Sequence, residues 1–218
     1  MRYLYVKRIM DVVISGCLLI VLAPIMLIVA IAIKIDSKGA VIFKQNRLTK
    51  DGKVFQMYKF RSMCDNAQNM GTGIKNYAND FRVTRVGKFI RKTSIDELPQ
   101  LFNVLKGDMS LIGPRPPVEK LSLGEYEDLP YKYKKRFEVK AGITGLAQVN
   151  GRNELSWEQK VVFDNEYVDR IAKEGLKLDI EILYRTIGVV FGQKGILQDK
   201  EREMNDKSKK EIRESKNK

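Results

Sequence analysis

The sequence predicts a mostly helical α+β fold, made of an N-terminal membrane helix, a β-hairpin and a small helical domain on the membrane surface. Three observations predict it. Residues 12–33 carry no charge, residues 40–61 contain two β-rich runs around an Asp-Gly turn signal, and the second half of the chain places apolar residues at helical spacing behind helix caps. We therefore expect a membrane segment (1–36), a folded domain (37–195) and a charged, disordered tail (196–218).

The apolar run is long enough to cross a bilayer. As one straight helix, residues 12–33 would extend roughly 33 Å, against a hydrocarbon core of about 30 Å. Pro24 favours a kink near the middle, and basic residues flank both ends, which leaves little asymmetry for the positive-inside rule. A re-entrant helix that breaks at Ala23-Pro24 would keep these cations on one face. The residues support this arrangement and a kinked span about equally, whereas a signal peptide cleaved near 30–32 is disfavoured by the length of the run.

The elements after the membrane segment follow from turn and cap residues. A turn at 49–52 joins the two strands of the hairpin, and residues 64–79 are expected to form a helix and then a loop. Pro99 to Lys106 predicts a short helix that ends at Gly107. A capping box at 156–159 opens a helix through about Lys173. In residues 176–191 an apolar stripe predicts a helix that packs on the core or lies on a bilayer, formed by Ile180, Leu183, Ile187 and Val190.

Two adjacent carboxylates, Asp96 and Glu97, stand just before Leu98-Pro99. They fit a capping box with Ser94 as N-cap, but Pro99 would then occupy the fifth helical position, where proline is costly. A helix that begins at Pro99 suits the proline better and leaves the acidic pair outside its N-terminus. Both registers remain open, so the pair stays a candidate chemical site.

The composition narrows the chemistry. The chain has 218 residues and a net charge of +13, from 40 Lys+Arg against 27 Asp+Glu, which favours anionic partners. It contains no histidine, so acid–base or nucleophilic chemistry must come from other side chains or a bound ion. Its two cysteines, Cys17 and Cys64, predict neither a disulfide framework nor a zinc site.

Several basic residues could contact phosphate, although a solvated surface charge is the better explanation for most of them. Arg115 is the exception, because three neighbouring prolines hold it in a rigid Gly-Pro-Arg-Pro-Pro segment. Residues 142–153, GITGLAQVNGRN, suit either a phosphate- or sugar-binding loop or an ordinary polar loop. The chain has neither a P-loop nor a GxGxxG motif. The other cations near the acidic pair are Lys59, Arg61, Arg82, Arg85, Lys88, Arg91 and Lys92.

Together these segments resemble the bacterial sugar transferases, that is, the monotopic phosphoglycosyl (polyprenyl-phosphate hexose-1-phosphate) transferases. The matching pieces are KRIMD (7–11), FKQNR (43–47), KFRSM (59–63), the long stretch at 82–116, GITGLAQVNGRN, and finally Asp164, Tyr167 and DIEILYRT (179–186). The resemblance covers residues 1 to about 192. Phe81 stands where many relatives have proline, and Ala23 where some have serine; the second difference bears on how the membrane helix breaks.

The resemblance implies a re-entrant helix and a catalytic domain (37–195) on the cytoplasmic face of the bacterial inner membrane. It implies transfer of a sugar-1-phosphate from a UDP-sugar to polyprenyl (undecaprenyl) phosphate with UMP release, the first membrane step of a bacterial surface glycan or glycoconjugate pathway. Asp96 would be the nucleophile of a ping-pong mechanism, Glu97 its partner, and Mg²⁺ would bind both. Our substrate- and phosphate-binding candidates are Lys59, Arg61, Arg85, Arg91, Arg115, Gln148, Asn150, Arg152, Asp164 and Tyr167.

Two other functions remain open. A membrane-tethered protein could bind nucleic acid or another anionic polymer, but the cations form neither a helix stripe nor an aromatic platform, so we expect no nucleic-acid partner. A catalytically idle relative could act as an assembly scaffold. Membrane phospholipid is an expected partner, a homo-oligomer stays open, and the sequence does not identify the donor sugar.

Overall fold

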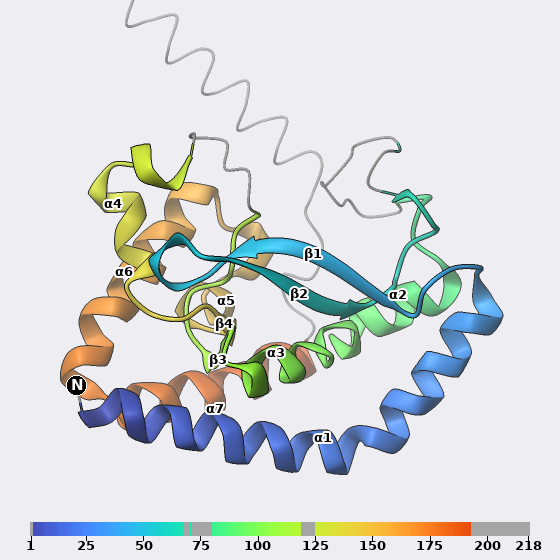
Figure 1. Ribbon diagram of the computed structural model, residues 1–218, viewed down its shortest axis with the longest axis horizontal. Coiled ribbons are helices and arrows are strands. Elements are labelled where there is room, and N and C mark those ends of the chain that lie inside the picture. The colour runs from blue at the N-terminus through green and yellow to red at the C-terminus, as the bar shows by residue number, and fades with distance from the viewer. Residues whose placement is uncertain (1, 68–69, 71–79, 119–124, 193–218) are drawn as a thin grey trace, which may run out of the picture.

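The computed structural model describes residues 2–67, 70, 80–118 and 125–192. It is mostly helical, as the sequence predicts, and contains the sheet β1-β2 and a second small sheet, β3-β4, that the sequence did not predict. Figure 1 shows the long helix α1 beneath the rest of the molecule, with the short helix α3 between it and the hairpin. The predicted tail (196–218) and most of the helix and loop predicted over 64–79 lie outside the described residues.

In chain order the helices and strands are α1 (Arg2–Asp36), β1 (Ile42–Leu48), β2 (Val54–Phe60), α2 (Arg85–Lys92), α3 (Gln100–Lys106), β3 (Ser110–Ile112), α4 (Tyr131–Lys134), β4 (Gly142–Thr144), α5 (Leu146–Val149), α6 (Trp157–Glu174) and α7 (Leu176–Gly192). Short 3-10 turns lie between them, at Lys50–Gly52 (η1), Ile95–Glu97 (η3), Tyr126–Asp128 (η4), Lys135–Phe137 (η5) and Arg152–Glu154 (η6).

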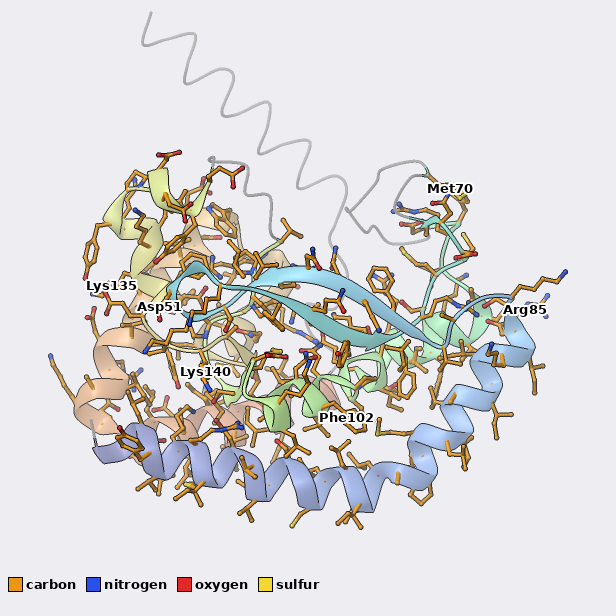
Figure 2. All side chains as sticks on the ribbon, viewed as in Figure 1. Asp51, Met70, Arg85, Phe102, Lys135 and Lys140 are labelled. Atoms are coloured by element: carbon orange, nitrogen blue, oxygen red, sulfur yellow. The ribbon has the colours of Figure 1, made fainter. Side chains whose placement is uncertain are left out.

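Helix α1 corrects the predicted break at Ala23-Pro24. It stays helical through Pro24 and changes direction along its length instead (Figure 1). Proline removes one hydrogen bond to the preceding turn, while the bonds on either side continue, so the helix bends without ending. By length and composition α1 could cross a membrane. Its outward side chains are exposed and apolar (Figure 2), among them Ile9, Val13, Ile20, Val21, Leu27, Ile28 and Ile31.

The beginning of α1 is held to the domain by charged side chains. Lys7 and the hydroxyl of Tyr3 both bind the carboxylate of Asp179 on α7. Arg8 donates to the carbonyls of Val104 and Leu105 in the last turn of α3, where basic side chains commonly bind the final carbonyls of a helix. Asp11 accepts a hydrogen bond from the amide of Leu111 on β3, at 3.0 Å. These contacts explain why the KRIMD segment carries its charges at the edge of an apolar helix.

The end of α1 contacts the same domain. Asp36 accepts from the amide of Val86 in the first turn of α2, at 3.0 Å. The buried Arg61 donates to the carbonyl and hydroxyl of Ser37, directly after the helix. A small apolar cluster, which contains Val29, Ile33, Phe60 and Ile90, joins α1 to β2 and α2. Both ends of this 35-residue helix are thus bound to one folded domain.

The predicted hairpin is confirmed. Strands β1 and β2 pair antiparallel from Ile42 opposite Phe60 to Leu48 opposite Val54. Asp51, in the turn, has φ 58°, a left-handed conformation that aspartate tolerates better than most residues. On α3, the buried side chain of Asn103 accepts from the amide of Tyr58 and donates to the carbonyl of Gln56. These two hydrogen bonds satisfy backbone groups on the unpaired edge of β2 and fix α3 beneath the hairpin.

The second half of the chain forms the main core. Strands β3 and β4 pair in parallel, and their residues pack with Phe55, Val104, Met109, Leu178 and Ile182. The capping box at Ser156 is confirmed, since both reciprocal hydrogen bonds with Gln159 are present. In α7 the core face is formed by Leu178 and Ile182. Of the predicted stripe, Ile180 is 56% exposed and Ile187 is 58% exposed, whereas Leu183 and Val190 line a cavity next to α1.

Candidate active site

The acidic pair lies in the short turn η3, immediately before α3. Ser94 has a left-handed conformation (φ 58°) and makes no side-chain cap, so the capping-box register at Ser94 is wrong. Pro99 is instead the N-cap of α3, and Gly107 ends that helix with φ 92°, as the second register predicts. Asp96 and Glu97 are therefore held outside the helix, half-buried, with their carboxylates available to other groups.

Glu97 is the fixed member of the pair. One oxygen of its carboxylate, Oε1, accepts from Lys59 Nζ at 2.8 Å and from Arg115 Nη2 at 2.9 Å. Removal from water by itself would raise the pKa of Glu97, but the charges of Arg115 and Lys59 hold the pKa well below its usual range. Glu97 is thus an ionised group held between two cations from β2 and the loop after β3.

Asp96 has a different environment. None of the side-chain hydrogen bonds or ion pairs found in the described part of the chain involves its carboxylate. Burial raises the pKa of the Asp96 carboxyl to about 6; Lys59 opposes this shift and Glu97 adds to it. Two neighbouring carboxylates therefore differ: one is bound by cations, and the other has no such partner in the described part of the chain. Such a separation is typical of acid, base and nucleophile assignments in active sites.

Arg115 is positioned from behind by a buried ion pair. Arg136 donates to the carbonyl of Arg115 at 2.7 Å and pairs with Asp164 on α6 at 2.7 Å. The side chains of Arg136 and Asp164 are 2% and 1% exposed, respectively. Arg47, in the FKQNR segment, donates to the carbonyl of Pro116. The rigid loop at 113–117 is therefore fixed both by its prolines and by two arginines.

The glycines of the GITGLAQVNGRN segment serve close backbone packing. A Cβ on Gly142 would lie 2.1 Å from the amide nitrogen of Gly113, and one on Gly145 would lie 2.1 Å from the carbonyl oxygen of Gly113. Backbone atoms cannot shift far enough to relieve contacts this short, so these two positions require glycine. The segment brings the loop of Arg115 against β4 and α5, and its side chains, Gln148 and Arg152 among them, face a cavity.

The cavity has a volume of about 290 Å³ and lies between η3, the loop after β3, α1 and α7. Its polar end consists of Thr93, Ser94, Glu97, Arg115, Gln148 and Arg152. The remainder is apolar apart from Thr144 and Thr186, and is formed by Leu18, Leu22, Leu98, Leu101, Leu111, Ile143, Val149, Leu183, Val189 and Val190.

The structure thus brings together six of the candidates: Asp96, Glu97, Lys59, Arg115, Gln148 and Arg152. Arg91 on α2 is near enough to act on Asp96 electrostatically. Arg85 is exposed at the start of α2 (Figure 2), and Asn150 binds the carbonyl of Leu146 and Arg185.

Three candidates lie away from the acidic pair. Arg61 closes the end of α1, as described above. Tyr167 is 1% exposed and donates to Asp179 and to the carbonyl of Ile112. Asp164 is buried behind Arg115. The sequence did not single out Arg136, because no local motif marks a residue that acts through a distant partner.

The acidic pair could hold a divalent cation. Within the described residues there is no group of three or more His, Cys, Asp or Glu that could hold a metal ion. Mg²⁺ commonly takes one or two carboxylates and completes its coordination with substrate phosphates and water. The unengaged carboxylate of Asp96 and the second oxygen of Glu97 fit that donor set.

The comparisons with known proteins identify a family. The family profile described as "Bacterial sugar transferase" matches residues 2–193. A UDP-glucose:undecaprenyl-phosphate glucose-1-phosphate transferase from Klebsiella pneumoniae is 46% identical over 83% of this chain. A UDP-N-acetylgalactosamine-undecaprenyl-phosphate N-acetylgalactosaminephosphotransferase from Aeromonas hydrophila is 42% identical over 87% of this chain.

The matches differ in how much of the relative they cover. The chain spans 39% of the Klebsiella relative and 44% of the Aeromonas relative. It spans 90% of the uncharacterized sugar transferase EpsL from Bacillus subtilis, to which it is 43% identical over 88% of its own length. The shared region is therefore one that also occurs nearly alone.

Proposed function

Because this chain belongs to the bacterial sugar transferase family, we propose that it transfers a sugar-1-phosphate from a UDP-sugar to a polyprenyl phosphate and releases UMP. The observation that carries the proposal is the contrast within the acidic pair: Asp96 is unengaged, while Glu97 is held by Lys59 and Arg115. The names of the relatives support undecaprenyl phosphate as the acceptor and differ in the sugar. The product would begin assembly of a surface glycan or glycoconjugate at the inner membrane.

In the first step an oxygen of Asp96 attacks the β-phosphorus of the UDP-sugar. A bond forms between this oxygen and phosphorus, and the bond from that phosphorus to the bridging oxygen breaks, so UMP leaves with the bridging oxygen. The sugar-phosphate stays on Asp96 as an acyl phosphate. A carboxylate nucleophile can replace one difficult displacement by two easier ones.

In the second step a phosphate oxygen of the polyprenyl phosphate attacks the same phosphorus. The bond to Asp96 breaks, the carboxylate is regenerated, and a polyprenyl-diphosphate-sugar is formed. Neither step requires a histidine, in agreement with a chain that contains none.

The cations around the pair offset the negative charge of the reacting groups. Lys59 and Arg115 hold Glu97 ionised and face the phosphates, and Arg152 extends this positive region, with one guanidinium nitrogen 3.2 Å from the hydroxyl of Ser94. Mg²⁺ bound by Asp96 and Glu97 would further neutralise charge on the phosphates. Asp164 and Arg136 contribute by holding the backbone of Arg115.

The attachment of α1 supports a re-entrant topology with the catalytic domain on the cytoplasmic face. A straight spanning helix would place its ends on opposite sides of the membrane, yet both ends of α1 contact one domain. In a chain with Cys17 and Cys64 replaced by serine, cysteines introduced at Tyr5 and Lys38 should react with an impermeant reagent only after the cells are permeabilised. Labelling of one position in intact cells would indicate a spanning helix.

The reaction is tested by UMP release from UDP-glucose, UDP-galactose and the UDP-N-acetylhexosamines, with nanodisc-held protein, with and without Mg²⁺. We expect release from at least one donor, dependence on Mg²⁺ and loss in Asp96→Asn. Asp169→Asn, an exposed carboxylate on α6, is the matched control and should retain activity. A folded protein that releases no UMP from any donor would favour a scaffold, and salt-dependent binding to nucleic acid would favour a tethered polymer binder.

A further inference from the structure

The cavity described above approaches the acidic pair from the side of the membrane helix. Leu18 and Leu22 of α1 and Leu183, Val189 and Val190 of α7 line its apolar part. Glu97 and Arg115 lie at its polar end, whereas Asp96, Lys59 and Arg91 do not line it. The cavity therefore meets the pair at Glu97 and Arg115, while Lys59, which binds the same oxygen of Glu97, lies outside its lining.

Two side chains at the polar end lack partners among the described residues. Gln148 is 6% exposed, and neither its amide nitrogen nor its amide oxygen makes a hydrogen bond. Arg152 donates from Nη2 to the hydroxyl of Ser94, but its buried Nη1 has no acceptor. Buried polar groups without partners are costly, so native proteins seldom keep them unless water or a ligand completes them. Both residues line the cavity, so its polar end offers a guanidinium nitrogen and an amide to an anion.

The shape and chemistry of the cavity fit a lipid with a terminal phosphate. A guanidinium nitrogen and an amide can bind a phosphate, while the leucines and valines of α1 and α7 suit a branched hydrocarbon. At about 290 Å³ the cavity has room for the phosphate and the first isoprene units only. The rest of such a chain would lie outside the cavity, in the hydrocarbon of the bilayer.

We propose that this cavity is the acceptor site, with Arg152 and Gln148 as the ligands of the polyprenyl phosphate and with Leu18, Leu22 and Leu183 against its first isoprene units. The assignment rests on the proposed function and deepens it, because it separates the two substrates. The acceptor phosphate reaches the phosphorylated Asp96 past Glu97 and Arg115, and the nucleotide donor occupies the side of Lys59 and Arg91.

The test uses two measurements on each variant, in nanodiscs: the burst of UMP release without acceptor, and the transfer of the enzyme-bound sugar-phosphate to undecaprenyl phosphate. Leu22→Trp fills the apolar part of the cavity. Val21→Trp, its neighbour on α1, is 70% exposed and is the matched control. We expect the ratio of transfer to burst to fall about tenfold or more in Leu22→Trp and to stay at the wild-type value in Val21→Trp. Equal ratios in both variants would overturn the proposal.

Two further variants test the polar end. Arg152→Ala and Gln148→Leu should raise the KM for undecaprenyl phosphate about tenfold or more, with a smaller change in the KM for the UDP-sugar, and Arg152→Lys should recover part of the loss. A larger effect on the donor KM would assign these residues to the nucleotide instead. Absence of a UMP burst in the wild-type protein would count against the proposed function itself. Failure of the proposed reaction is thereby distinguished from failure of the acceptor-site assignment.

A direct binding measurement on the wild-type protein tests the assignment even if the variants fold poorly. A photoreactive isoprenoid phosphate should cross-link the wild-type protein in peptides that contain Leu18 or Leu22, or Leu183. Undecaprenyl phosphate should compete with the probe, and phosphatidylglycerol vesicles should not. Equal competition by phosphatidylglycerol would show a general lipid site and refute the assignment, as would cross-links confined to other peptides.

Discussion

Replacement of Asp164 by asparagine tests how the loop of Arg115 is held. Asp164 and Arg136 form an ion pair at 2.7 Å, with side chains 1% and 2% exposed. Asparagine would leave the Arg136 guanidinium charged, buried and without its counter-ion. Removal of one partner of a buried pair typically costs about 3–5 kcal/mol. For a chain of this size each kcal/mol lowers Tm by about 2–4 °C, so we expect Tm to fall by roughly 6–20 °C.

The assay compares this variant with one on the protein surface. Asp169→Asn breaks the pair with Lys135, which has nearly the same length, 2.6 Å, but in which Asp169 is 58% exposed. Such pairs contribute about 0–1 kcal/mol. Thermal unfolding of both variants in the same nanodiscs, monitored by tryptophan fluorescence, gives the shift in Tm for each variant.

A double variant separates stability from positioning. In Arg136→Met/Asp164→Leu the pair is replaced by apolar side chains, which should recover much of the stability. UMP release should remain about tenfold or more below wild type, because the carbonyl of Arg115 has lost the donor that holds it. A Tm of Asp164→Asn within about 2 °C of that of Asp169→Asn would refute this account of the loop, as would full activity in the double variant.

Three other predictions follow from the structure. Because the pKa of Asp96 is raised to about 6 and the ionised form reacts, kcat/KM for the UDP-sugar should fall about tenfold per unit below that pH; a profile that is flat to pH 5 would contradict this. Asp179→Asn weakens the contacts with Tyr3 and Lys7 that hold α1, so trypsin should cleave near the N-terminus faster than in wild type, and equal rates would count against that anchor. Gly142→Ala places a Cβ 2.1 Å from the amide of Gly113, and we expect a loss of roughly 1–3 kcal/mol or more in stability; an unchanged Tm would be inconsistent with this close contact.

Local signals in the sequence predicted the elements whose stability is itself local. The Asp-Gly turn predicted the hairpin, the box at Ser156 predicted the start of α6, and Pro99 with Gly107 predicted both ends of α3. The helix register with a capping box at Ser94 is wrong, although residues 94–97 match that motif in full. Pro99 cannot continue a helix from Ser94 without loss of a hydrogen bond, and the chain turns through a left-handed residue there instead.

Contacts between distant segments had no comparable signal. The strands β3 and β4 have three residues each and pair across an intervening segment of the chain, so neither shows a period. The role of Arg136 depends on Asp164 and on the carbonyl of Arg115, none of which is its neighbour in sequence. The periodicity of 176–191 predicted α7 but not which face is buried, because the outward face of this helix is also apolar.

The site itself was partly predictable. The acidic pair and Arg115 stood out from the sequence by their rigid setting, and the structure joins Arg115 to Glu97 at 2.9 Å. The sequence did not predict the amphipathic cavity, because its lining comes from α1, α3, β3, β4, α5, α7 and the turns and loops beside them. Asp164 and Tyr167 were chosen by resemblance, and their burial shows that a residue can belong to a motif through the partner it positions.

The most direct test of the account is the search for the sugar-phosphate on Asp96. Nanodisc-held protein would be incubated with the active UDP-sugar without acceptor, quenched, and measured by intact mass and peptide mapping. The account predicts an added mass of one sugar-phosphate on the peptide that contains Asp96, its absence in Asp96→Asn, and its loss when undecaprenyl phosphate is added. UMP release that needs the acceptor from the start, with no added mass on the protein, would contradict a covalent intermediate at Asp96.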